Sequence, residues 1–293
     1  MPSDVSCKSL VGVSPSKSQE FNNLFALLIG INDYTFEGSK LKGAVDDANN
    51  VKEYLTGTLD VPLRNIKVLL DQEASRANII KEIEKLEVKE EIAKDDPILI
   101  YFAGHGNTAP YEGSEHHEVE LILPCDYGKD ENGRIVNGIL DLTVSALLAK
   151  LAEAKGNNIT IILDCCHAGS GTRDGEYLIR TVGGTIPVPL DLDEDIHSSV
   201  CGARATRTPS GFLSKGLNSH VLLAACGRNE NAREKRVTGG LFTRVLLDTL
   251  KSADTMAITY EDLMKKLPPI GSVKVITGIG NSSVRKCPYE GQW

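Results

Sequence analysis

The hydrophobic pattern of this chain alternates between two kinds of segment. Short apolar runs, typical of strands that are covered on both faces, occur at 24–31, 65–70, 96–104, 158–163 and 220–226. Segments with helical periodicity lie between or after them, at 44–57, 75–94, 142–154, 239–253 and 259–267. An alternating segment at 117–123 predicts one further strand. Strands separated by helices predict an α/β fold with a mostly parallel central sheet flanked by helices.

Two segments interrupt this pattern. Residues 1–22 are rich in Ser and Lys without periodicity, which predicts a disordered N-terminal segment. Residues 183–218 carry proline, glycine and spaced basic residues, and so long an unpatterned stretch predicts a functional loop or a linker. Within it, we expect the acidic cluster "DLDEDIH" at 191–197 to be a solvated loop.

Composition narrows the possible partners and compartment. The 293 residues carry a net charge of −8, and their basic residues are scattered, which argues against a nucleic-acid or anionic membrane surface. The first residues lack the apolar core of a signal peptide, and no apolar segment approaches the ~20 residues that span a bilayer. Seven cysteines without a CxxC pair fit free thiols better than a disulfide framework. We therefore expect a cytoplasmic protein.

Two predicted strands end in polar residues and glycines. The first ends in "YFAGHGN", with His105 between two glycines, and the second ends in "DCCHAG". The carboxyl ends of parallel strands form the usual site of chemistry in an open α/β sheet. Because successive strand side chains point to opposite faces, Cys165 and Cys166 cannot both enter one site. At most one of them is the working thiol.

His105 and a cysteine of the second strand end would make a dyad whose members are distant in sequence and close in space. The imidazole can take the thiol proton and later donate a proton to a leaving amine. The backbone N–H of Gly106, together with that of Cys166, would form an oxyanion hole.

Other interpretations of these residues are weaker. A cysteine alone at a strand end is more often inert core, and a histidine between glycines can simply cap a turn. Adjacent residues cannot converge on a zinc ion, and strand geometry opposes a disulfide between neighbouring cysteines. A cysteine phosphatase needs C-x5-R, whereas Cys166 and Arg173 are spaced as C-x6-R. Two glycine-rich breaks at two strand ends favour the dyad.

These motifs, with "LKGAVDDANNV" before them and "HVLLAACGRNENARE" and "GGLFT" after them, resemble the caspase-like cysteine peptidases, particularly metacaspases. The resemblance covers roughly 24–270. It implies a caspase–haemoglobinase fold with a large catalytic subunit at 23–182, the linker at 183–218, and a small subunit at 219–293. It also implies that Cys166 is the nucleophile, that His105 is the base, and that Cys165 faces the core.

The resemblance further implies an acidic specificity pocket. The metacaspase pocket acids match Asp47 and Asp164, and carboxylates favour a basic residue before the scissile bond through charge-assisted hydrogen bonds. An acid near a helix N-terminus, such as Asp47, can also serve only the helix dipole. The chain departs from the family at two substrate-binding positions, where Ala44 replaces the usual cysteine and Ala103 a frequent serine.

The family's calcium site is poorly matched. At the position of its acid pair this chain has Asn137 and Gly138, and a hard cation needs several anionic oxygens. The remaining weak candidates for metal ligands are Glu120, Asp126 and Asp174. We expect no required cofactor, and weak calcium binding or none.

The sequence thus predicts a cysteine endopeptidase that acts on proteins after Arg or Lys. The exposed linker carries three candidate self-processing sites, Arg204, Arg207 and Lys215. The rival hypothesis is a catalytically silent scaffold of the same fold that acts by protein binding, and the intact Cys/His pair argues against it. The oligomeric state stays open at this point.

Overall fold

The computed structural model describes most of the chain between Phe21 and Thr277. The described residues are 21–36, 39–113, 118–129, 132–165, 177–180, 182, 184–198, 220–225, 233–235, 239–252, 258–268 and 274–277. Within these ranges no helix is both long enough and apolar enough to cross a membrane.

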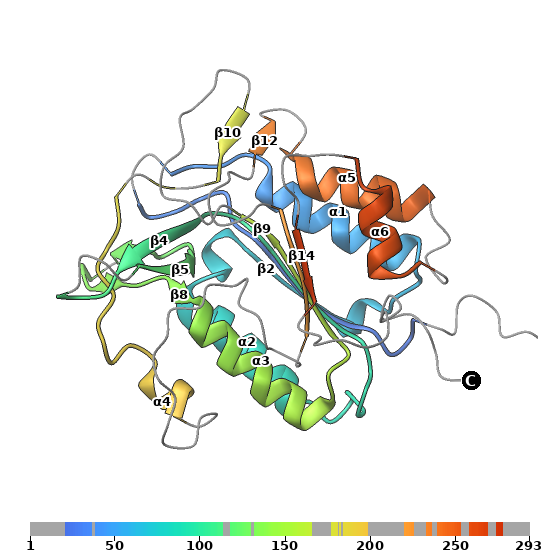
Figure 1. Cartoon of the computed structure of the whole chain (residues 1–293), viewed down its shortest axis with the longest axis horizontal. Helices are drawn as coiled ribbons and strands as arrows, with labels where there is room; N and C mark the ends of the chain where they lie inside the picture. Colours follow the sequence, from blue (N-terminus) through green and yellow to red (C-terminus); the bar gives the residue numbers. More distant parts are fainter. Residues whose placement is uncertain are drawn as a thin grey trace, which may run out of the picture.

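A six-stranded sheet forms the centre of the fold, in the order β14-β11-β9-β3-β1-β2 (Figure 1). Its strands are β1 (Phe25–Gly30), β2 (Ile66–Leu70), β3 (Ile98–Ala103), β9 (Ile159–Asp164), β11 (Val221–Ala224) and β14 (Lys274–Thr277). All neighbouring strands are parallel except β11 and β14. β1, β3 and β9 are buried along their whole length, which explains their unbroken apolar sequence. The predicted α/β architecture is confirmed.

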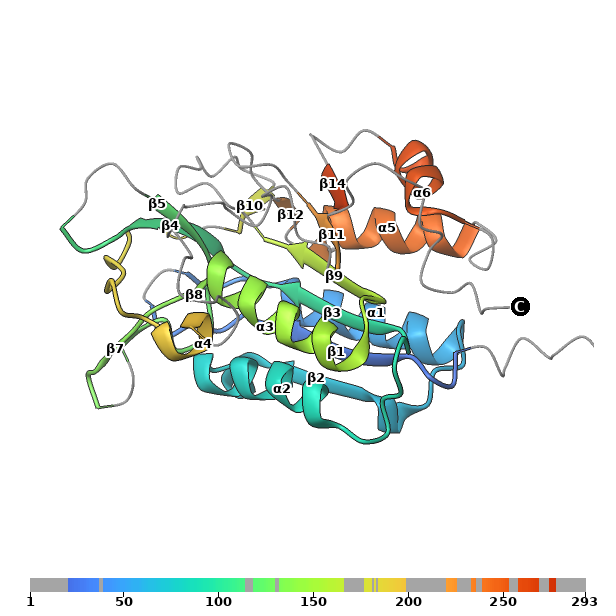
Figure 2. The ribbon, with the colours of Figure 1, turned by 60° about the horizontal axis from the view of Figure 1, so that its bottom comes forward.

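Helices cover both faces of this sheet (Figures 1 and 2). One face packs against α1 (Ala44–Gly57), α5 (Leu241–Ser252) and α6 (Tyr260–Lys266), and the other against α2 (Arg76–Val88) and α3 (Asp141–Lys155). The strand residues alternate between two apolar cores, so that Leu28 joins the first core and Ile29 the second. Short 3₁₀ turns flank β2 at Leu63–Asn65 and Asp71–Glu73.

Smaller sheets extend the carboxyl end of the central sheet (Figures 1 and 2). β4 (Gly106–Pro110), β5 (Glu118–Ile122) and β8 (Ile139–Leu140) form one of them. β10 (Tyr177–Ile179), β12 (Arg233–Lys235) and β13 (Gly239–Gly240) form another, and β6 (Gly128–Lys129) pairs with β7 (Ile135–Val136). Apart from β5, these strands are short or rich in glycine and charge, so the hydrophobic pattern does not predict them.

The helix predicted over 75–94 is too long. α2 ends at Val88, and the chain then turns, with the Asp96 side chain accepting from the Ala93 N–H at 2.7 Å. The ammonium of Lys155 donates to the carbonyls of Lys89 and Ile92, at 2.8 and 3.0 Å. These carbonyls are therefore satisfied by a side chain from α3 rather than by a continuing helix.

The expectation of a solvated loop is wrong for the acidic cluster at 191–197. Val188 forms a β-bridge with Tyr111, and a short helix, α4, spans Glu194–Ser198. The acidic cluster docks onto the molecule, because Asp193 forms an ion pair with Arg76 at 2.5 Å and accepts from the Thr143 hydroxyl at 2.7 Å. The rest of the linker, including Arg204, Arg207 and Lys215, lies outside the described residues.

Candidate active site

His105 lies at the carboxyl end of β3, where the chain turns from the central sheet into β4. Its backbone N–H donates to the Tyr34 hydroxyl at 2.7 Å, and the two rings lie 4.8 Å apart between centroids. A Cβ at Gly104 would approach the Tyr34 hydroxyl oxygen to 2.5 Å. Glycine is therefore required before the histidine, because any side chain there would displace the tyrosine that holds it.

The ring of His105 is held by a backbone carbonyl. Its Nε2 lies 2.5 Å from the carbonyl oxygen of Ser39, and the ring is almost fully buried. A carbonyl oxygen can only accept a hydrogen bond, so Nε2 carries the proton. In a neutral imidazole this tautomer makes Nδ1 the acceptor. His105 is thus prepared to take a proton through Nδ1.

Asp47 and Asp164 converge on one arginine that the sequence interpretation did not select. Arg180, directly after β10, is fully buried, and its Nη2 donates to Asp47 Oδ2. Its Nη1 lies 3.0 Å from Asp164 Oδ1 and donates to the Asp164 carbonyl at 2.9 Å. The two carboxylates therefore bind the same guanidinium.

Backbone and hydroxyl donors hold the two carboxylates in place. The Gly240 N–H donates to both oxygens of Asp47, at 3.1 and 2.8 Å. Asp164 Oδ2 accepts from the N–H and the hydroxyl of Thr243, at 3.2 and 2.6 Å. Because the Thr243 hydroxyl gives its proton to Asp164, the Tyr101 hydroxyl, 2.6 Å away, must donate to Thr243.

Asp47 and Asp164 are buried, and an unpaired charge in a buried position is energetically costly. Burial raises the pKa of Asp47 to about 6; Arg180 and the Gly240 N–H lower it, whereas the neighbouring charge of Asp164 adds to the increase. Asp46, beside Asp47 on α1, is exposed instead. Asp47 is therefore more than a helix-dipole acid, because its side chain binds groups from β13 and from the residue after β10.

The cysteine pair is described only in part. Cys165 is fully buried in the core beneath α2 and α3, so its predicted structural position is confirmed. Cys166 lies outside the described residues, and its role as nucleophile stays a prediction.

The other two positions that the resemblance assigns to substrate binding are buried near the acid pair. Ala103 is fully buried and stands opposite Asp164 in the β3–β9 register, and Ala44, also fully buried, begins α1. The N–H of Gly106, the predicted oxyanion donor, donates to the Arg180 carbonyl at 3.1 Å.

The candidate metal ligands do not form a cluster. Asp126 accepts from the Arg76 N–H at 2.8 Å at the start of α2, while Glu120 is buried on β5 opposite Thr108. Asp174 lies outside the described residues, which contain no group of three or more His, Cys, Asp or Glu able to hold a metal ion. A Cβ at Gly138 would lie 3.0 Å from the Cβ of Leu121, so an acid would not fit there without rearrangement.

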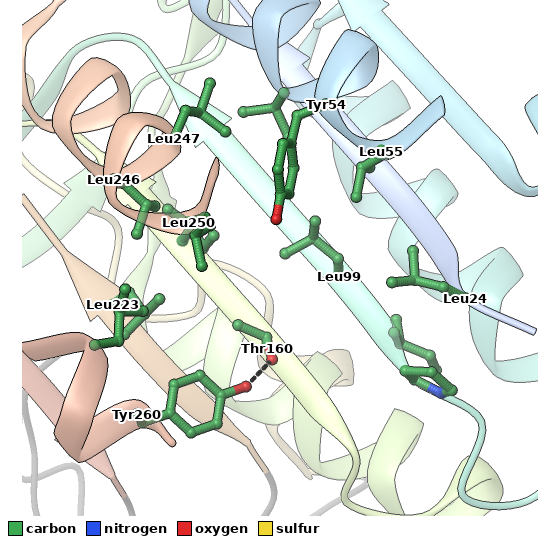
Figure 3. Close-up of a pocket in the computed structure, with 15 residues that line it drawn as sticks. Leu24, Tyr54, Leu55, Leu99, Thr160, Leu223, Leu246, Leu247, Leu250 and Tyr260 are labelled. Carbon is green, nitrogen blue, oxygen red and sulfur yellow. Dashed lines mark hydrogen bonds between the residues drawn. The ribbon is translucent and has the colours of Figure 1, made fainter. Parts of the chain in front are cut away.

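An apolar cavity lies at the other end of the sheet (Figure 3). It is lined by aliphatic residues of α1 and α5 and by residues near the beginning of strands, such as Leu99. The hydroxyl groups of Tyr260 and Thr160, which also line it, form a hydrogen bond of 2.6 Å. Leu99 and Thr160 lie near the beginning of β3 and β9, respectively. In contrast, Asp164 ends β9, and His105 lies two residues beyond the end of β3. The cavity is therefore separate from the candidate active site.

The sequence pattern does not point to three residues of the site, namely Arg180, Gly240 and Thr243. "GGLFT", which holds Gly240 and Thr243, contributes only to the family resemblance. A Cβ at Gly240 would lie 2.5 Å from Asp164 Oδ2 and 2.7 Å from Asp47 Oδ2, so the second glycine of that motif is the usable signal. Arg180 lies in a polar stretch with no motif.

The sequence is similar to known proteins of one family. The profile of the caspase domain family matches residues 23–268. Metacaspase-1B of Aspergillus clavatus is 26% identical over 251 residues, covering 81% of this chain and 57% of the relative. Metacaspase-1 of Eremothecium gossypii is 31% identical over 175 residues, covering 57% of this chain and 36% of the relative. The chain thus spans between 36% and 57% of the length of these two curated relatives.

A solved structure shares the fold. The crystal structure of a protein from Geobacter sulfurreducens superposes with a TM-score of 0.63 at 19% sequence identity, covering 88% of this chain and 95% of that one. At this identity the likeness supports the fold alone.

Proposed function

The chain belongs to the caspase domain family, and from that premise we propose that it is a cysteine endopeptidase that hydrolyses peptide bonds after Arg or Lys. The observation that carries the specificity is the pair Asp47 and Asp164, two buried carboxylates that bind a single guanidinium. An Asp side chain at that position would meet two carboxylates, a like-charge contact that costs several kcal/mol when it is desolvated. We propose proteins and peptides with a basic residue before the scissile bond as substrates.

The proposed reaction uses His105 and Cys166. His105 Nδ1 takes the thiol proton, and the thiolate attacks the substrate carbonyl to form a thioester, while the imidazolium gives its proton to the leaving amine. The Gly106 N–H and the Cys166 N–H would stabilise the negative oxygen of the intermediate. The support for His105 as the base is its Nε2 contact with Ser39, which fixes the acceptor at Nδ1.

The test is steady-state kinetics on matched fluorogenic peptides that differ only in the residue before the scissile bond. The peptide with Arg should be cleaved fastest and the peptide with Asp slowest. The peptide with Lys should be cleaved more slowly than that with Arg, because an ammonium is a point charge and lacks the planar guanidinium that can bind two carboxylates. Preferential cleavage after Asp would overturn the specificity but would leave the Cys166–His105 dyad intact.

The second candidate function is a silent scaffold that acts by protein binding. Rapid alkylation of Cys166 by iodoacetamide at neutral pH would support the enzyme, since only an activated thiolate reacts fast. Slow alkylation together with no turnover on any peptide would favour the scaffold.

We also propose a cytoplasmic location and a role in cell death or stress signalling. The buried free thiols of Cys125 and Cys165 support the location, and the resemblance to metacaspases supports the role. Imaging of the tagged full-length protein tests the location, and survival of a strain carrying Cys166→Ala under stress tests the role.

A further inference from the structure

The segment before the predicted linker lies across the candidate active site. The carbonyl oxygen of Arg180 accepts from the N–H of Gly106 at 3.1 Å. This N–H is the donor that the proposed mechanism assigns to the carbonyl under attack. The carbonyl of Arg180 thus lies where a scissile carbonyl would be bound.

The side chain of the same residue fills the acidic pocket. Its guanidinium is 0% exposed and contacts Asp47 and Asp164. Arginine is almost never fully buried unless it is paired, and here both partners are the residues proposed to select substrate. One residue therefore satisfies the oxyanion donor and the specificity acids together.

The backbone that leads to Arg180 forms a strand at the edge of a small sheet. β10, which is Tyr177–Ile179, pairs antiparallel with β12, with Ile179 opposite Arg233 and Tyr177 opposite Lys235. β12 in turn pairs with β13, which supplies Gly240 to the acid pocket. Strand addition is a common way for a protein to bind an extended peptide, because hydrogen bonds to the peptide main chain provide the affinity.

We propose that Tyr177–Arg180 occupies the site as an internal substrate and that the bond after Arg180 is the self-processing bond. This rests on the proposed function. Before the cut, the segment fills the pocket and competes with peptides in solution at the high effective concentration of a linked ligand. The inferred bond precedes the linker, and thus differs from Arg204, Arg207 and Lys215.

The covalent step uses only the proposed machinery and water. The thiolate of Cys166 attacks the carbonyl carbon of Arg180, the bond to the nitrogen of Thr181 breaks, and that nitrogen takes the proton held by His105. Water then attacks the thioester and gives a proton to His105, which releases the Arg180 carboxylate and restores the thiol. The reaction requires neither an oxidant nor a metal ion.

The test follows the purified full-length chain by intact mass and N-terminal sequencing. The expected product is a fragment that begins at Thr181, whose rate of formation is unchanged on about 100-fold dilution because the substrate is intramolecular. Arg180→Gln and Cys166→Ala should abolish it. Arg180→Lys should cut the same bond at least about 10-fold more slowly, because Lys cannot bridge both acids. Arg64→Gln, the same exchange at an exposed arginine, should leave the rate unchanged.

The variants distinguish a cleaved Arg180 from an Arg180 that has only a structural role. Arg180→Gln leaves two buried acids without their guanidinium and can fail to fold, so Arg180→Lys decides in that case. A wild-type chain that cleaves Arg peptides but keeps the bond after Arg180 intact, or an Arg180→Lys chain processed at the wild-type rate, would overturn the inference and leave the proposed function standing. A chain that cleaves neither itself nor any peptide would refute both.

Discussion

Asp164 and Cys165 are neighbours in sequence and lie on opposite sides of the central sheet. Asp164 accepts from Thr243 at the start of α5, whereas Cys165 packs into the core covered by α2 and α3. The alternation of strand side chains produces this separation, so one residue can serve the site while the next serves the core.

The first prediction tests this division. Cys165→Ala should keep most of the activity and lose about 1–2 kcal/mol of stability, because it removes one buried sulfur from a packed core. Cys166→Ala should fold as well as the wild type and show no turnover. The measurements are peptide hydrolysis and urea unfolding of both variants. A well-folded but inactive Cys165→Ala alongside an active Cys166→Ala would reverse the assignment.

The sequence predicts β1, β2, β3, β9 and β11 of the central sheet from their apolar runs, and β1, β3 and β9 show this pattern because they are buried along their whole length. It does not predict the edge strand β14. It predicts α1 over the same residues, 44–57, as the structure has it. The elements that build the substrate side of the site are different. β10, β12 and β13 have two or three residues each, so no periodicity can reveal them.

The same reason explains which site residues were predictable. Asp164 ends the long buried strand β9, and His105 follows the long buried strand β3 by two residues, so their polar side chains stand out in the sequence against apolar neighbours. Arg180 follows a three-residue strand, and its place between Asp47 and Asp164 depends on contacts far apart in the chain. Only the fold brings these residues together.

The second prediction concerns the room left by Gly240. Gly240→Ala should reduce kcat/KM on Arg peptides by more than about 100-fold, since the new methyl group would collide with both pocket acids and remove space for a guanidinium. The control is Gly57→Ala, where an added Cβ meets nothing within 4 Å. That variant should keep full activity and gain up to about 1 kcal/mol of stability, because alanine favours the helix. Equal kinetics for the two variants would exclude Gly240 from the pocket.

The third prediction concerns the charge of the pocket. Asp47→Asn and Asp164→Asn should each lower kcat/KM on Arg peptides by roughly 30- to 1000-fold, the loss of one desolvated charge pair. Peptides with a neutral residue at that position should change far less. Asp46→Asn is the matched control, because it makes the same exchange one residue away on the exposed side of α1. A uniform loss on all peptides would indicate a structural defect instead of a specificity contact.

The fourth prediction concerns calcium. A chelator should reduce peptide hydrolysis little, because Asn137 and Gly138 replace the family's acid pair and Gly138 packs against Leu121. The measurement is the rate on an Arg peptide with EDTA and after addition of calcium. A sharp loss with EDTA that micromolar calcium restores would contradict the prediction.

The fifth prediction concerns acid stability and begins with His220, which precedes β11 and is 8% exposed. Burial lowers its pKa to about 4 from the ordinary value near 6.5. Between these values the unfolded chain binds a proton that the folded chain does not, so the free energy of unfolding falls as pH falls through this window. The loss from His220 amounts to at most about 3 kcal/mol at the acidic end.

The wild-type curve alone cannot isolate this loss, because Asp47 acts in the opposite direction. Its raised pKa, about 6, means that the folded chain takes up a proton before the unfolded chain does, which favours folding as pH falls. The difference between wild type and His220→Gln cancels the Asp47 contribution, since both proteins keep that residue. Urea unfolding at about pH 7 and about pH 4.5 should therefore show a smaller acid-induced loss in His220→Gln than in wild type. Parallel losses in the two proteins would mean that His220 titrates normally in the fold.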